Sequence, residues 1–143
     1  KKRVIVLGST GSIGTQALEV IADNPERFEL VGISAHGSKP DVLAQQVREF
    51  GLDLQCVAVA SARTADWLDG EFGSRCIRGK DSARMLVEEI GPTLGESDVI
   101  LNALVGSLGL DATLATLGTQ AKLALANKES LVAGGQLLSL IHI

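Results

Sequence analysis

The chain has 143 residues, 45% of them hydrophobic, and its mean hydropathy of +0.26 is typical of a folded globular domain. A net charge of −4 and an aromatic content of 3% provide neither a basic field nor stacking platforms, so we expect no nucleic acid among its partners. No apolar run reaches the roughly 18 residues of a membrane span. The apolar run before Gly8 is too short for a secretory signal, so we expect a cytoplasmic protein without a membrane partner.

Short apolar runs alternate with amphipathic segments, which is the pattern of βαβ units and a parallel sheet. Strands are expected at residues 3–7, 28–34, 56–59, 76–77, 98–103 and 122–126. Helices are expected at residues 12–24, 39–50, 62–72, 81–90 and 111–117. We expect Ser38 to cap the second helix, and Met85, Leu86 and Ile90 to face inward from the fourth. The expected fold is α/β, a Rossmann-type doubly wound and mostly parallel sheet in a single domain.

A glycine-rich turn joins the first expected strand to the first expected helix. Glycines let the backbone turn tightly and come close to a pyrophosphate, while the first N–H groups of the helix and its dipole favour negative charge. The pattern is Gly-x-x-Gly-x-x-Gly, and it occupies the residues Gly8-Ser9-Thr10-Gly11-Ser12-Ile13-Gly14. A purely structural turn is the alternative, but the strand–turn–helix context favours nucleotide binding.

The loop after the second expected strand bears on the choice of cofactor. NAD-preferring domains place an Asp or Glu there to bind the ribose 2′-hydroxyl. Residues 34–39 contain no carboxylate, and the segment His36-Gly37-Ser38-Lys39 instead carries groups that can donate to a 2′-phosphate. This favours NADP over NAD. The alternative is that His36 and Lys39 are simply solvent-exposed loop residues.

Two polar segments follow later strands, at the sheet edge where parallel sheets bind their ligands. The glycines within residues 102–109 would let the backbone lie close to a cofactor, although the residues alone favour a strand-to-helix loop that merely needs glycine. The segment Asn127-Lys128-Glu129 offers an amide, a cation and a carboxylate to a ribose or a phosphate. A polar turn that caps the next helix is the alternative.

The remaining reactive residues form no pattern typical of a catalytic or metal site. The chain has two histidines, and its carboxylates are scattered over the expected helix faces. Cys56 and Cys76 have no second cysteine pair and no neighbouring histidine, which favours two reduced thiols over a zinc site or a disulfide. We therefore expect the domain to hold a cofactor rather than a complete catalytic set.

Three strings, in this order, resemble the 1-deoxy-D-xylulose 5-phosphate reductoisomerase family. They are Gly8-Ser9-Thr10-Gly11-Ser12-Ile13-Gly14, Asn24-Pro25-Glu26-Arg27-Phe28 and Leu125-Ala126-Asn127-Lys128-Glu129-Ser130-Leu131-Val132. The last string is highly specific to this family. The resemblance runs from about Arg3 to Gly135, and residues 42–96 match only loosely.

The resemblance implies the NADPH-binding domain of an enzyme that isomerises and reduces 1-deoxy-D-xylulose 5-phosphate to 2-C-methyl-D-erythritol 4-phosphate in isoprenoid synthesis, with Mg²⁺ or Mn²⁺. By motif, the pyrophosphate would be held by Thr10, Gly11, Ser12 and Ile13. NADPH would also contact Asn127 and Glu129, and the sugar phosphate would contact Lys128. The family often has a basic Ala-Gly-Lys-Asn loop after the second strand, where this chain has Ala35-His36-Gly37-Ser38.

By the same resemblance, residues 1–135 are expected to be the NADPH-binding domain and residues 136–143 a truncated or foreign tail. The family's metal ligands, its loop over the substrate and its C-terminal domain would follow this segment, so we expect no metal site in these residues and no activity from the chain alone. The parent family is generally homodimeric. The alternatives are another NADP-dependent reductase, of the semialdehyde or dihydrodipicolinate type, and a non-catalytic NADP-sensing module.

Overall fold

The computed structural model describes residues 1–104, 112, 115–116 and 118–125. Within these residues the strands are β1 (Lys2–Leu7), β2 (Phe28–Ala35), β3 (Val57–Val59), β4 (Ile77–Arg78), β5 (Val99–Asn102) and β6 (Lys122–Leu125). The helices are α1 (Ser12–Asp23), α2 (Pro40–Phe50), α3 (Ala62–Phe72) and α4 (Ser82–Ile90), with short 3₁₀ turns at Leu54–Cys56 and Gly91–Thr93. Each of these strands and α-helices begins and ends within one residue of its expected bounds. None of the described helices is long and apolar enough to cross a membrane.

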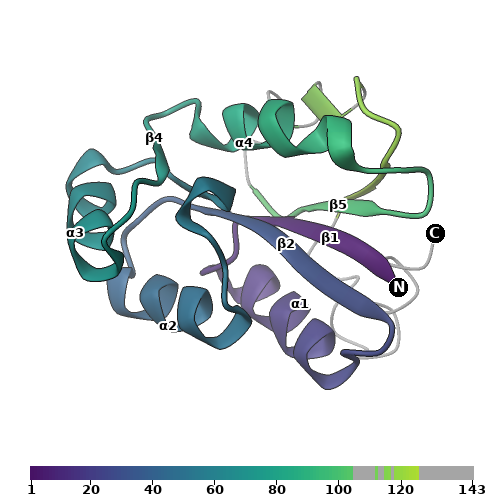
Figure 1. The fold of residues 1–143 in the computed structure, drawn as a ribbon, viewed down its shortest axis with the longest axis horizontal. Helices are drawn as coiled ribbons and strands as arrows, with labels where there is room; N and C mark the ends of the chain where they lie inside the picture. Colours follow the sequence, from purple (N-terminus) through teal and green to yellow (C-terminus); the bar gives the residue numbers. More distant parts are fainter. Residues whose placement is uncertain (105–111, 113–114, 117, 126–143) are drawn as a thin grey trace.

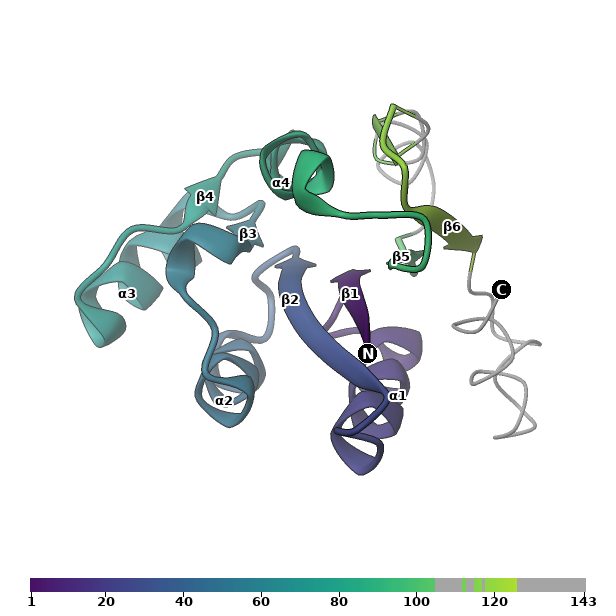
Figure 2. The ribbon, with the colours of Figure 1, turned by 45° about the vertical axis from the view of Figure 1, so that its right-hand side comes forward.

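The six strands form one sheet in the order β4-β3-β2-β1-β5-β6, and every neighbouring pair is parallel. The chain moves outward from β1 through β2 and β3 to β4. It then returns to the other side of β1 to form β5 and β6 (Figures 1 and 2). The strand order therefore reverses between β1 and β5. In open parallel sheets, ligands bind beyond the carboxyl ends of the strands at such a reversal.

Helices cover both faces of the sheet, as the expected doubly wound fold requires. In Figure 1, α1 and α2 lie below the sheet and α4 lies above it. Side chains of β1 alternate between the two cores: Val4 and Val6 pack on the side of α1, α2 and α3, and Ile5 and Leu7 pack on the side of α4. All four are fully buried, because β1 is central and has helices on both faces.

Two expectations about helix positions are wrong. The residue that precedes α2 is Lys39 rather than Ser38, and no side chain caps this helix. Ser38 instead lies exposed in the preceding bend, where its side chain lines a recess described below. Met85 does not face inward, since 45% of it is exposed. The inward side of α4 is formed by Ser82, Leu86 and Val87.

The two cysteines are free thiols, as expected. Cys76 is buried against α3, where its thiol lies 3.8 Å from the carbonyl oxygen of Ala65. Burial and the neighbouring Asp69 raise the pKa of Cys76 to about 11. The Cys76 thiol is therefore protonated and weakly nucleophilic near neutral pH.

Candidate functional site

The turn from β1 to α1 is packed so tightly that two of its glycines have no room for a side chain. Gly8 has a φ of 84°, and a Cβ placed on it would lie 3.1 Å from the carbonyl oxygen of Ala103, beyond β5. A Cβ on Gly14 would lie 2.0 Å from the carbonyl oxygen of Gly8. Gly14 thus lets the first turn of α1 pack directly against the strand end.

Gly11, at the tip of the same turn, is not confined in this way. It is exposed, and among the residues that the structure describes a Cβ on it would meet no atom closer than the Gly8 carbonyl oxygen at 3.7 Å. Protein packing therefore gives no reason for a glycine at this position. The open space above Gly11 is where a ligand can approach the backbone closely.

Hydrogen bonds fix the turn to β2 and α2. The backbone N–H groups of Gly8 and Ser9 both donate to the carbonyl oxygen of Ser34, at 2.9 and 2.8 Å. The buried side chain of Gln46, on α2, donates from Nε2 to the carbonyl oxygen of Ser9 at 2.9 Å. The turn is therefore held in place without a ligand.

The N-terminus of α1 opens toward this space. Gly11 is its N-cap residue, no side chain caps it, and its first turn contains no acidic residue. The first N–H groups of a helix have no partner within the helix, and the helix dipole adds a partial positive charge there. Uncapped and without an acidic residue in its first turn, this helix end is suited to an anion such as a pyrophosphate.

A recess of about 430 Å³ lies over the turn and is lined by most of the expected cofactor residues. Its lining includes Thr10, Gly11, Ser12, Ile13, His36, Ser38 and Lys39. The ammonium of Lys39 lies 3.4 Å from the carbonyl oxygen of Thr10, which places a cation beside the turn. The glycine motif and the loop after β2, which are separate in the sequence, therefore line one recess.

Gly37 does not line this recess and has a structural role. Its φ is 106°, and a Cβ on it would lie 2.9 Å from the Cβ of Ser61. The hydroxyl of Thr64, on α3, donates to its carbonyl oxygen at 2.7 Å. Gly37 thus anchors the loop between β2 and α2 against the start of α3, and leaves His36 and Ser38 exposed on the other side.

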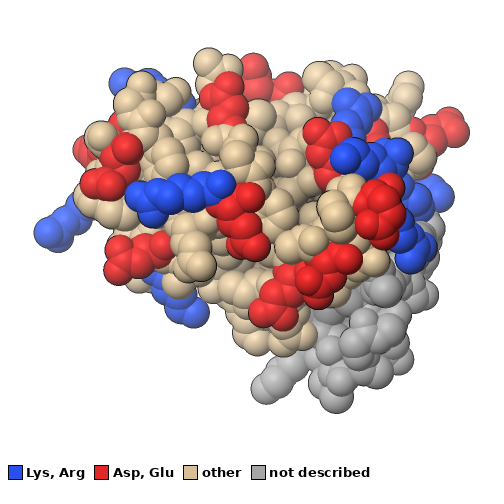
Figure 3. Space-filling model, turned by 60° about the horizontal axis from the view of Figure 1, so that its bottom comes forward, with Lys and Arg blue, Asp and Glu red and all other residues tan. Residues whose placement is uncertain are grey.

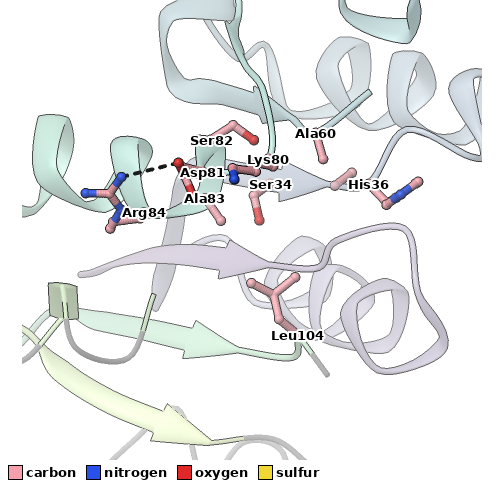
Figure 4. Close-up of a pocket in the computed structure, with 10 residues that line it drawn as sticks. Ser34, His36, Ala60, Lys80, Asp81, Ser82, Ala83, Arg84 and Leu104 are labelled. Atoms are coloured by element: carbon pink, nitrogen blue, oxygen red, sulfur yellow. Dashed lines mark ion pairs between the residues drawn. The ribbon is translucent and has the colours of Figure 1, made fainter. Parts of the chain in front are cut away.

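A second, smaller recess adjoins the first at the carboxyl ends of β2 and β3 (Figure 4). Ser34 lines it from β2, Ala60 from the end of β3, and Lys80 and Arg84 from the start of α4. His36 and Leu104 line both recesses, which makes one continuous groove along the sheet edge. Sequence reasoning missed the part contributed by residues 80–84. The only sequence signal for this part of the recess is a positively charged turn after an edge strand, and ordinary solvent-exposed turns have the same composition.

At the ends of β5 and β6 the structure describes only part of the expected site. Ala103 and Leu104 line the first recess, and the backbone N–H of Leu104 donates to Oδ1 of the buried Asn102 at 3.0 Å. Asn127, Lys128 and Glu129 lie outside the described residues. The strand before them, β6, is parallel to β5 and pairs through Leu125 with Asn102, so its carboxyl end lies at the edge of the sheet that bears the groove.

The charges on the α1 and α2 face are mixed. Figure 3 shows carboxylates and basic side chains interspersed on this face, so its basic residues do not merge into one patch. Exposed carboxylates there include Glu19, Asp23, Asp41 and Glu49. Within the described part of the chain, no three His, Cys, Asp or Glu side chains gather in a way that could hold a metal ion.

Comparison with known proteins agrees with this geometry. Residues 4–135 match the sequence model of the family described as 1-deoxy-D-xylulose 5-phosphate reductoisomerase. The enzyme of that name from Corynebacterium jeikeium is 87% identical over 138 residues, which are 96% of this chain and 34% of the relative. The chain therefore spans about a third of the length of this relative.

Solved structures of the same enzyme share the fold. The reductoisomerase from Zymomonas mobilis in complex with NADPH has a TM-score of 0.73 and 28% identity, over 98% of this chain and 36% of that one. A reductoisomerase in complex with NADPH, fosmidomycin and magnesium has a TM-score of 0.75 and 25% identity, over 99% and 34%. Together with the match over residues 4–135, these likenesses show that the chain belongs to the 1-deoxy-D-xylulose 5-phosphate reductoisomerase family.

Proposed function

We propose that this chain binds NADPH in the groove along the carboxyl ends of its strands. The observation that carries the proposal is the turn at Gly11, where an uncapped helix N-terminus faces open space that protein packing does not require. The pyrophosphate would lie there, against Thr10, Gly11, Ser12 and Ile13. The solved structure of the reductoisomerase from Zymomonas mobilis is a complex with NADPH, which supports this choice of cofactor.

The groove also has the shape that a dinucleotide needs. Dinucleotide-binding sheets place the adenosine ribose at the end of the second strand, which is the side of β2 and β3 here. The second recess lies on that side and is partly lined by the small side chains Ala35, Ala60 and Ala83. The nicotinamide would then lie on the side of β5 and β6.

We further propose that the whole enzyme converts 1-deoxy-D-xylulose 5-phosphate to 2-C-methyl-D-erythritol 4-phosphate. When bound, NADPH supplies the hydride for the reduction. By motif, Asn127 and Glu129 would orient the cofactor, and the ammonium of Lys128 would bind the sugar phosphate. Mg²⁺ or Mn²⁺ would be held by residues of the enzyme outside this chain.

Isothermal titration of the chain with NADPH and with NADH, at one fixed salt concentration, tests the cofactor proposal. We expect binding that is selective for NADPH, because no carboxylate follows β2 to accept a ribose 2′-hydroxyl. Failure of both cofactors to bind would contradict the proposal. Equal or tighter binding of NADH would contradict the assignment of the loop after β2.

We expect the 143-residue chain alone not to turn over the sugar phosphate, because it spans about a third of its relatives. An NADPH oxidation assay with 1-deoxy-D-xylulose 5-phosphate and Mg²⁺ checks this, with the full-length enzyme as positive control. Cofactor binding without turnover in the full-length protein would instead favour a sensing module. We also propose a homodimer for the full-length enzyme, which light scattering would measure.

A further inference from the structure

The adenosine end of the groove contains a positive charge outside the loop after β2. If NADPH binds as proposed above, its 2′-phosphate lies near the end of β2, and some cation must meet it there. The described side chains that line the groove around this point include three basic ones: Lys39, Lys80 and Arg84. Their different surroundings separate their roles.

Two of these cations are already engaged. The ammonium of Lys39 points to the glycine turn and lies 3.4 Å from the Thr10 carbonyl oxygen, on the pyrophosphate side of the groove. The guanidinium of Arg84 lies between two carboxylates, 3.6 Å from Asp81 and 3.1 Å from Glu88. Arg84 is therefore already engaged by carboxylates, and its charge offsets only part of the negative charge of Asp81 and Glu88.

Lys80 is the cation that remains available. It lines the second recess together with Ser34 and His36, and Figure 4 shows its side chain beside Ser34, over the end of β2. Among the residues that the structure describes, no carboxylate oxygen lies within 4.0 Å of its ammonium. Lys80 is exposed and lines the groove, so within the described part of the chain its ammonium is free of carboxylate partners.

The backbone around Lys80 is fixed on both sides. Gly79 has a φ of 109°, and its N–H donates to the carbonyl oxygen of Val59, on β3, at 3.1 Å. The N–H of Ser82 donates back to the Gly79 carbonyl oxygen at 3.0 Å. Arg78, just before the turn, is paired with Asp66 and Asp69 on α3. Lys80 therefore projects from a turn that is already formed before any ligand binds.

We propose that the Lys80 ammonium binds the 2′-phosphate of NADPH and is a determinant of selectivity for NADPH over NADH. The contact comes from the start of α4, across the recess from the loop after β2, so the phosphate lies between Lys80 and the exposed side chains of His36 and Ser38. This inference rests on the proposed binding of NADPH. It assigns the selectivity to a residue that lies some forty positions beyond the loop where sequence reasoning places it.

The test is a titration of the chain and its Lys80→Gln variant with NADPH and NADH. Because a charge-assisted hydrogen bond is lost, we expect NADPH binding to weaken by about tenfold to a hundredfold and NADH binding to stay unchanged. Lys80→Arg should restore most of the preference. The matched control is Lys1→Gln, which removes the same charge before the amino end of β1, away from the groove, and should change neither affinity.

The outcomes separate this inference from the proposed function. An unsubstituted chain that binds neither cofactor would overturn the proposed function, and the inference with it. An NADPH-selective chain in which Lys80→Gln keeps the same ratio of affinities would overturn the inference alone. A parallel loss of NADPH and NADH binding would also overturn it, because Lys80 would then act on a shared part of the cofactor or on the fold. Thermal unfolding of each variant shows whether such a parallel loss comes from a destabilised fold.

Discussion

At the scale of single residues, two glycines of one turn have opposite functions. Gly14 is buried, and a side chain on it would collide with the backbone of Gly8. Gly11 is exposed, and the protein leaves space above it. Both occupy positions of one repeated pattern in the sequence, and only the structure shows that one of them serves packing and the other serves the ligand.

Substituting each glycine by alanine separates the two functions. We expect Gly14→Ala to lower the free energy of unfolding by about 3 kcal/mol or more, because backbone atoms cannot yield as a flexible side chain can. Gly11→Ala should lower stability by no more than about 1 kcal/mol, the cost of a poorer N-cap residue, yet weaken NADPH binding at least about tenfold, because its methyl group lies where the pyrophosphate would approach. Urea unfolding and calorimetric titration measure the two effects.

The result would be inconsistent with this division of roles if Gly11→Ala bound NADPH as well as the unsubstituted chain does. A fully stable Gly14→Ala variant would show that α1 can move away from the strand end at little cost. Either outcome would remove the physical argument for the site at the turn.

At the scale of the element, α3 contains a glycine at a position where a side chain would fit. Gly70 lies exposed inside the helix, and a Cβ added to it would have no atom within 4 Å. Gly73 ends the same helix with a φ of 65°, in the left-handed region where side chains are strained. The same substitution should therefore have opposite signs three residues apart.

We expect Gly70→Ala to raise the free energy of unfolding by about 0.5–1 kcal/mol, since alanine loses less backbone entropy than glycine when a helix forms. Gly73→Ala should lower it by about 1 kcal/mol, because of the positive φ at the helix end. Thermal or urea unfolding would measure both. Effects of the same sign would contradict the helix boundary at Phe72.

Most elements could be predicted from the sequence because periodicity and glycine or proline stops are local signals. The bounds of α2 are an example, since Pro40 and Gly51 mark its two ends. The role of Lys80 could not be predicted this way. It depends on the strand order, which brings the start of α4 beside the ends of β2 and β3, and no local pattern specifies that arrangement. Met85 was misplaced because its helix has apolar residues on neighbouring faces.

At the scale of the whole molecule, one carboxylate joins segments from distant parts of the chain. Asp98, just before β5, is buried and accepts hydrogen bonds from the backbone N–H groups of Arg3 and Gly95, each at 2.9 Å. The Arg3 guanidinium pairs with it at 2.9 Å. Burial alone would raise the pKa of Asp98, but these hydrogen bonds and the Arg3 charge outweigh it and hold the pKa below its usual value.

A carboxylate with a lowered pKa in the folded state stabilises the fold above its unfolded pKa, and this contribution is lost as the pH falls through its folded pKa. We expect Asp98→Asn to cost about 2 kcal/mol near pH 7, and this difference to shrink as the pH is lowered below about 4. Urea unfolding across this pH range measures it. As a control, Glu88→Gln removes an exposed partner of Arg84 and should cost less than about 0.5 kcal/mol at any pH. A cost of Asp98→Asn that did not vary with pH would contradict the ionic role.

The reversal of strand order also sets the order in which the strands can pair while the chain is being synthesised. On a ribosome, β1 can pair with β2 within a few tens of residues, but its other edge waits for β5, whose Val99 pairs with Val4. At about 5–20 residues per second, this delay lasts roughly 5–20 s. During that time a strand with four fully buried apolar residues, Val4 to Leu7, has a free edge, open to pairing with another chain. The strand that supports the nucleotide turn is thus also the point at which a nascent chain is most exposed to aggregation.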